Sequence, residues 1–181
     1  AQTGGQARLA QLLPKRSEFG GIITNLTAEA ERHGATIHRR SEVTRQLLLA
    51  EKPDVVILAA GSKPHAPPFE GEVAQMVHVA DILAGRATTG QKVVVYDWMG
   101  DWGGSGIAEK LAAEGASVGL LDADIYGPSQ PMMMGLSGRP ESADGKTMQP
   151  LEAHGVQVMS IGFLVAQDQA MVWRGPMVTS A

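Results

Sequence analysis

The sequence contains no cysteine. This excludes disulfides, a thiol nucleophile and a Cys-ligated metal or iron–sulfur cluster within these 181 residues. The absence also fits a cytoplasmic protein. Aromatic residues make up only 4%, whereas glycine occurs 22 times. This balance is typical of an α/β protein with many tight turns between strands and helices.

Positive charge is not in excess, and long apolar runs are absent. The net charge of −4 argues against a nucleic-acid partner held by phosphate contacts. No apolar run reaches transmembrane length and no signal peptide is visible, so we expect no membrane partner. With 44% hydrophobic and 19% charged residues, the chain should be globular. Its five histidines show no metal-ligand spacing and are interpreted as surface or half-buried residues.

Residues 92–128 carry the strongest pattern in the chain. A buried strand is predicted at 93–96, a helix at about 105–114 and a second buried strand at 117–121. Between the first strand and the helix lies a glycine-rich turn, formed by Gly100, Gly103, Gly104 and Gly106. The second strand ends at Asp122, and the order of these elements is that of a nucleotide-binding βαβ unit.

Two interpretations of this unit stay open. Glycine N–H groups and the helix N-terminus can approach a phosphate, and Asp122 stands where an acid can bind a ribose hydroxyl. The spacing, however, is G-x-x-G-G-x-G, and Asp97 and Asp101 would repel a pyrophosphate. No Lys lies in the turn, so it is not a P-loop. The alternative is an ordinary crossover whose glycines only allow tight packing.

Elsewhere the pattern predicts further elements. We expect a helix over 18–33, capped by Ser17 and ended by Gly34. Residues 54–60, DVVILAA, are a continuous apolar run that predicts a buried parallel strand. The remaining expectations are a leading loop at 1–16, a short strand at 35–38, an ambiguous segment at 42–50, a short helix at 81–84, a loop rich in Gly, Pro and Met at 125–140, a strand at 156–161 paired with 148–151, and a further element at 170–173.

Residues 1–118 resemble the FAD/NAD(P)-binding region of flavoproteins of the trimethylamine dehydrogenase, histamine dehydrogenase and dienoyl-CoA reductase type. Three stretches carry the resemblance: GGQARLAQLLPKRSEF, DVVILAAGSKPHAPPFEG and VVVYDWMGDWGGSGIAEKLAAEGASV. The resemblance implies that Gly61 lies near a bound dinucleotide, although Ala60 stands where the family has Thr. It also implies that the first glycine motif and a flavin-bearing barrel lie upstream.

Residues 119–181 resemble a second family, the Mrp-type P-loop ATPases that carry or assemble iron–sulfur clusters. The stretches are GLLDADIYGPSQP, GLSGRPESADGKTMQPLEAHGVQVMSIGFL and MVWRGPM. The resemblance implies that Asp122 and Asp124 lie beside Mg–nucleotide, with Asp124 as the metal residue. The Lys-bearing loop of that family would fall at 97–106, where this sequence has no Lys. The resemblance places the family's Walker B acid and cluster-binding cysteines beyond residue 181.

Together these observations predict an α/β fold with a mostly parallel Rossmann-like sheet and flanking helices, incomplete at both ends. We expect two partial domains, 1–118 and 119–181, and the sequence leaves open whether their join is natural, recombinant or assembled from mixed reads. The main expectation is the nucleotide-binding portion of a flavin-dependent oxidoreductase, not catalytic alone. The candidate cofactor-binding residues are Gly61, Gly100, Gly103, Gly104, Asp122 and Asp124, and the cofactor is FAD, NAD(P)H or ADP.

Two alternatives remain. One is an ATP-binding iron–sulfur cluster carrier of Mrp type, which predicts Mg-ATP as the ligand. The other is a non-catalytic α/β scaffold. No catalytic residue is identified under any of the three, and we expect a homodimer or neighbouring domains as partners.

Overall fold

The computed structural model describes residues 2–62, 75–124 and 127–164. It divides into two compact units, Ala1–Ala84 and Gly85–Ala181. Val118 and Gly119, where the two resemblances meet, are consecutive residues inside one strand of the second unit. The division into domains at 118/119 therefore stays a prediction.

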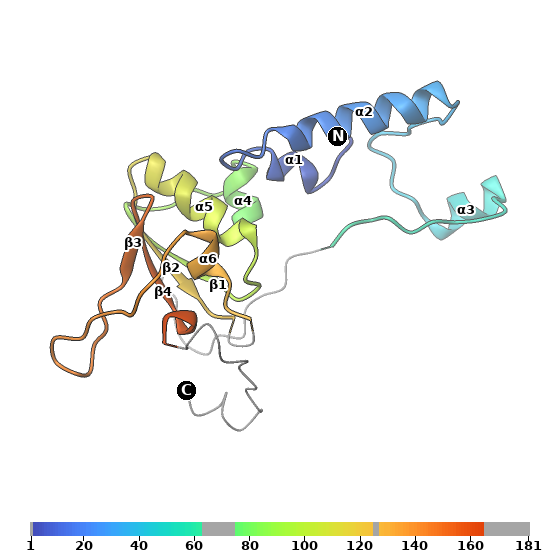
Figure 1. Ribbon diagram of the computed structural model, residues 1–181. Coiled ribbons are helices and arrows are strands. Elements are labelled where there is room, and N and C mark those ends of the chain that lie inside the picture. The colour runs from blue at the N-terminus through green and yellow to red at the C-terminus, as the bar shows by residue number, and fades with distance from the viewer. Residues whose placement is uncertain (1, 63–74, 125–126, 165–181) are drawn as a thin grey trace. The chain divides into compact units, whose positions relative to one another are not determined.

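The first unit is helical. Its helices are α1 (Ala7–Ala10), α2 (Glu18–Arg32), α3 (Arg45–Glu51) and α4 (Val79–Leu83). Helix α1 packs against α2 (Figure 1). Leu13, just after α1, is buried. Helix α1 falls in the segment predicted as a loop, and α3 resolves the segment that was ambiguous. Helix α4 corresponds to the short helix expected at 81–84, and it begins two residues earlier and ends one residue earlier.

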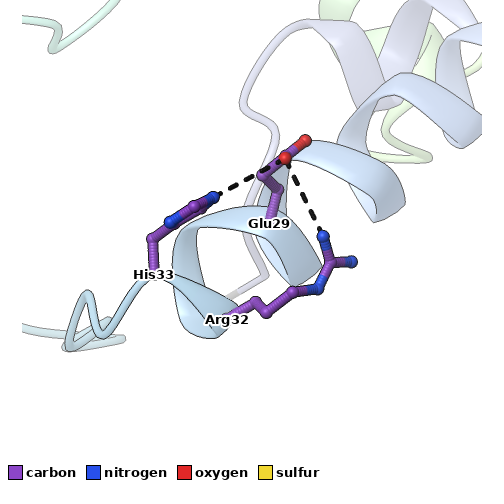
Figure 2. Close-up of polar contacts among 3 residues, drawn as sticks. All are labelled: Glu29, Arg32 and His33. Atoms are coloured by element: carbon purple, nitrogen blue, oxygen red, sulfur yellow. Dashed lines mark ion pairs between the residues drawn. The ribbon is translucent and has the colours of Figure 1, made fainter.

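Helix α2 confirms the helix predicted from the apolar spacing, but its N-terminus differs. The Ser17 side chain makes no capping hydrogen bond, because Ser17 itself has helical backbone angles. The C-terminus ends as expected: Gly34 has φ +84°, and the N–H of Ala35 donates to the carbonyl of Ala30 at 2.9 Å. The last turn also carries exposed ion pairs from Glu29 to Arg32 and to His33, each 3.8 Å long (Figure 2). Such exposed pairs add little stability.

The predicted strand at 54–60 is wrong. These residues belong to no strand, and Ile57 and Leu58 are 85% and 89% exposed. An apolar run becomes a strand only when another strand pairs with it, and no part of the chain that the structure describes does so here. The short strand expected at 35–38 is likewise not formed.

The second unit is built on a four-stranded sheet of order β1-β2-β4-β3. Its elements are β1 (Lys92–Asp97), α5 (Trp102–Ala113), β2 (Ser117–Asp122), α6 (Gln130–Met133), β3 (Leu151–Ala153), β4 (Val156–Ser160) and the 3-10 turn η1 (Ile161–Phe163). Strand β2 pairs in parallel with β1 and with β4, and β3 pairs antiparallel with β4. The mixed α/β class with a mostly parallel sheet and flanking helices is confirmed (Figure 1).

The core lies between this sheet and α5. Alternate residues of β2 and β4 are buried, as are the residues of α5 that face them, because strand side chains point to opposite faces with a period of two. The buried apolar residues are Val95, Ile107, Ala108, Leu111, Val118, Leu120, Met134, Val156, Val158 and Phe163. On the opposite side Val94 is 73% exposed, so that face of β1 is open.

Three elements of this unit differ from the sequence prediction. Helix α5 begins at Trp102, three residues earlier than expected, because the Asp101 side chain caps it by accepting from Gly103 N–H at 2.7 Å. Helix α6 lies in the segment predicted as a loop. The partner of β4 is 151–153 and not 148–151. The element expected at 170–173 lies outside the described residues. Among the helices of the described ranges, none combines the length and apolarity that a bilayer crossing requires.

Candidate functional site

Two acids meet at the carboxyl edge of the parallel strands. Asp97 ends β1 and Asp122 ends β2, and the strand register pairs them directly. They are only 6% and 4% exposed. In parallel α/β sheets, ligands bind at this edge. Side-by-side parallel strands were the expectation on which the nucleotide-binding interpretation depended, and the structure confirms them.

Asp97 is held from three sides. Its Oδ1 accepts from the N–H groups of Met99 (3.2 Å) and Gly100 (3.1 Å), and its Oδ2 accepts from Gln130 Nε2 (2.5 Å). Burial raises the pKa of this carboxyl above its ordinary value. The hydrogen bonds from Gln130, Gly100 and Met99 act in the opposite direction, and the nearby charge of Asp101 raises the pKa further.

Asp122 binds three donors from its surroundings. Its Oδ1 accepts from Asp124 N–H at 3.2 Å, and its Oδ2 accepts from Gln130 N–H at 3.2 Å and from Ser160 Oγ at 2.8 Å. Ser160 ends β4, so this carboxylate joins β2, β4 and the start of α6. Asp122 was predicted to bind a ribose hydroxyl or to lie beside Mg–nucleotide. In the structure its two oxygens already accept from the protein.

Gln130 is a site residue that the sequence did not reveal. It is fully buried, and its Nε2 donates both to Asp97 and to the Asp101 carbonyl, the latter at 3.0 Å. Its Oε1 has no hydrogen-bond partner within the described ranges. A single Gln in a stretch rich in Gly, Pro and Met gives no local signal of burial. The stretch GLLDADIYGPSQP, which carries the second resemblance, contains Gln130 but does not indicate that it is buried.

The glycines have separate roles. Gly100 has φ +63°, and a Cβ there would lie 2.8 Å from Asp124 Oδ2, so the turn and this acid are in contact. Ser129 Oγ also donates to the Gly100 carbonyl. Gly103 and Gly104 lie inside α5 and not in a turn. A Cβ on Gly104 would lie 2.6 Å from Asp97 Cγ, so glycine lets the helix pack on that carboxyl.

Gly61 was predicted to lie near a bound dinucleotide. It belongs to the first unit, is exposed, and has φ +76°. A Cβ there would meet no heavy atom within 4 Å. Its assignment to a dinucleotide site stays a prediction.

The turn before α5 does not fit a phosphate chain. The N–H groups of Met99 and Gly100 bind Asp97, and that of Gly103 binds Asp101. No Lys or Arg stands between Lys92 and Lys110 to balance these acids. A unit negative charge about 4 Å from one of them would be repelled by about 4 kcal/mol at an effective dielectric near 20. We therefore derive no catalytic step through ATP at this turn.

The described part of the chain does not form a metal site from side chains alone. In residues 2–62, 75–124 and 127–164, no three His, Cys, Asp or Glu side chains are grouped to hold a metal ion. Asp124 Oδ1 accepts from Gly127 N–H at 3.2 Å. Its assignment as a metal residue stays a prediction.

Comparison with known proteins supports the second resemblance, to iron–sulfur cluster carriers. Residues 103–181 match the family model described as "ParA: NUBPL iron-transfer P-loop NTPase". The chain is 59% identical over 76 residues to the iron-sulfur cluster carrier protein of Escherichia coli (strain K12), an alignment covering 41% of this chain and 21% of that protein. It is 37% identical over 132 residues to the carrier of Synechocystis, covering 71% of this chain and 35% of that protein.

The similarity to carriers also reaches the first unit. The iron-sulfur cluster carrier protein of Deinococcus radiodurans is 30% identical over 176 residues, covering 92% of this chain and 46% of that protein. The chain thus spans less than half the length of these relatives. Among solved structures, a 2-naphthoyl-CoA reductase in complex with 2-naphthoyl-CoA matches with a TM-score of 0.59 and 24% identity. That match covers 87% of this chain and 27% of the reductase, and at this identity it shows the fold alone.

These findings overturn the main functional expectation. The sequence favoured a flavin-dependent oxidoreductase portion with FAD or NAD(P)H, whereas the relatives are iron–sulfur cluster carriers. The error arose because the first resemblance covered more residues, although the second carried the sharper motifs. Residues 103–181 are similar to iron-transfer P-loop NTPases.

Proposed function

We propose that this chain is part of an iron–sulfur cluster carrier of Mrp type. The observation that carries the proposal is the match of residues 103–181 to the iron-transfer family model, which includes β2 and the acids at its end. The cluster is the cargo of such a protein. Because the 181 residues contain no cysteine, thiolate ligands for a cluster must come from outside them.

Within this proposal, Asp122 and Asp124 are the residues nearest to a Mg-nucleotide. They follow β2 at the carboxyl edge of the sheet, and Asp124 lies against Gly100. Asp122 is the more structural of the two, since Ser160 and the backbone of Gln130 bind it. Asp124 is the acid that we assign to a bound metal. The chain's own hydrogen bonds give no step of hydrolysis.

A second candidate function is supported by the turn before α5. Because its N–H groups bind Asp97 and Asp101, the βαβ unit is also compatible with a non-catalytic scaffold. The two candidates differ in one measurable respect. A carrier portion with a nucleotide edge is stabilised by Mg-ATP, and a scaffold is not.

Thermal unfolding of the 181-residue chain with Mg-ATP, Mg-ADP, FAD and NADPH tests the proposal. Ligand binding to the folded state adds about 2.7 kcal/mol at a ligand concentration 100 times the Kd. We expect a rise in Tm with Mg-ATP that Asp124→Asn abolishes and Asp144→Asn leaves in place. A rise with FAD or NADPH and none with Mg-ATP would contradict the carrier assignment. No rise with any of the four would favour the scaffold.

A further inference from the structure

The turn that leads into α5 has the geometry of an anion-binding site, but its donors are bound by the protein's own carboxylates. Three N–H groups, those of Met99, Gly100 and Gly103, point to oxygens of Asp97 and Asp101 at 2.7–3.2 Å. A phosphate at a helix N-terminus would use these same donors. Asp97 and Asp101 therefore occupy the positions that phosphate oxygens would take.

Asp97 cannot easily leave this position. It is 6% exposed, and Gly104 allows α5 to pack directly on it, since a Cβ there would lie 2.8 Å from Asp97 Cβ. The strand that carries it pairs with β2 up to its last residue. Side-chain rotation toward solvent would therefore require α5 to move away from β1.

Gln130 fixes the arrangement from the other side. Its amide nitrogen donates to the carboxylate of Asp97 and to the carbonyl of Asp101. Rotating the amide by half a turn would place its oxygen against these two acceptors, which is unfavourable. Its buried Oε1 has no partner in the described residues. The acceptors near the turn thus select the amide orientation that holds the carboxylate of Asp97 and the backbone of Asp101.

We propose that Asp97 and Asp101 are built-in anions that close the turn before α5 to phosphate, and that Gln130 holds the Asp97 carboxylate and the Asp101 backbone in place. The proposal goes beyond the carrier assignment because it states which part of the βαβ unit does not contact nucleotide. Any nucleotide contact is then confined to the Asp122–Asp124 side of the edge. Specificity against phosphate at the turn is set by two side chains.

Amide NMR of the 181-residue chain titrated with inorganic pyrophosphate tests this. In the unsubstituted chain, the amide signals of Met99, Gly100 and Gly103 should not move. In the double variant Asp97→Asn, Asp101→Asn they should move, with pyrophosphate bound about tenfold tighter or more because two negative charges are removed. Both asparagines keep an oxygen that can accept the N–H groups in the absence of ligand.

The matched control is Asp144→Asn with Glu152→Gln. It removes the same two charges from exposed positions of the same unit. This control should bind pyrophosphate no more tightly at the turn than the unsubstituted chain does, because Asp97 and Asp101 still occupy the N–H donors. If the double variant at the turn does not fold, Asp101→Asn alone is used, because it leaves the buried Asp97–Gln130 hydrogen bond intact. Its Gly103 amide signal should move on titration with pyrophosphate, with a smaller increase in affinity than in the double variant.

Two results would overturn the proposal. One is movement of the three amides in the unsubstituted chain, and the other is a folded turn variant that binds no more tightly than the control. A failure of the carrier assignment can be distinguished from a failure of this proposal. Mg-ATP can stabilise the chain without moving these amides, and pyrophosphate can bind the variant even when Mg-ATP leaves the unsubstituted chain unchanged.

Discussion

Asp97 and Asp122 lie side by side as the last register pair of β1 and β2, and Gln130 binds both of them. Its side chain donates to Asp97 and its backbone N–H donates to Asp122. One residue at the start of α6 therefore connects the ends of two neighbouring strands. Three predictions test what this arrangement and its surroundings contribute, and a fourth concerns the β3–β4 hairpin.

Replacing Gln130 by Met should destabilise the second unit by about 3 kcal/mol, because the buried Asp97 carboxyl loses its side-chain donor. Met is similar in length and fills the space, so a cavity is not the cause. Urea unfolding followed by circular dichroism measures the change. The control is Gln157→Met at an exposed position of β4, expected within about 0.5 kcal/mol of the unsubstituted chain. Equal effects of the two substitutions would contradict a special role for Gln130.

Asp97→Asn should change how stability depends on pH. Burial raises the pKa of Asp97 in the folded state, so the folded chain binds this proton more tightly than the unfolded chain does. The stabilisation from protonation is fully present below the ordinary value of 3.8 and is lost as pH rises through the folded-state pKa. The neighbouring charge of Asp101 in the turn also repels the charged form of the carboxyl.

The stability of Asp97→Asn relative to the unsubstituted chain should therefore increase as pH rises from about 4 toward 7. Urea unfolding at several pH values gives this difference directly. A matched series on Asp101→Asn separates the effect of the neighbouring charge from that of burial. A difference that stays constant across the range would show that the pKa of Asp97 is the same in both states.

Gly104→Ala should destabilise the second unit by about 2 kcal/mol or more, since its Cβ would lie 2.6 Å from Asp97 Cγ and force α5 off β1. Gly21→Ala is the control. It lies in the exposed interior of α2, where an added Cβ meets nothing within 4 Å, and alanine there should raise helicity. Thermal unfolding by circular dichroism compares the two, and a neutral Gly104→Ala would show that α5 does not pack on Asp97.

His154→Asn should stabilise the β3–β4 hairpin by about 0.5 kcal/mol. His154 and Gly155 form its two-residue connection and have φ of +54° and +73°. Asparagine followed by glycine is preferred where both positions need positive φ. His154→Val tests the opposite direction and should cost about 1–2 kcal/mol. Urea unfolding measures both, and a stabilising Val would rule out backbone strain as the cause.

The sequence predicted the part of the fold that depends on local pattern and missed what depends on partners. The Val-rich run before Asp97 and the run ending at Asp122 both became strands, because each found a neighbour in the sheet. The run at 54–60 has the same local pattern and pairs with no strand within the residues that the structure describes. The start of α5 could have been found, because Asp101 is a favoured N-cap residue, but four glycines suggested a turn.

The features of the candidate site likewise divide into those that the sequence predicted and those that it missed. The βαβ order predicted Asp122 near the glycine turn, and the contact that the structure has at Gly100 is with Asp124. The binding of the turn's N–H groups by Asp97 and Asp101 could not be inferred beyond their repulsive charge, since it depends on side-chain direction. Gln130 was missed because its burial results from contacts with β1 and α5 and not from its neighbours in sequence.

The exposed run at 54–60 has a consequence for handling the purified chain. It combines β-branched and aliphatic residues with a single charge and no proline, which is the composition from which steric zippers assemble. Pairing between such runs on different molecules satisfies backbone groups that water now solvates. The time for which the chain stays in solution before aggregating should therefore fall steeply with protein concentration. The substitution Ile57→Lys should lengthen this time without altering the melting temperature of the sheet unit.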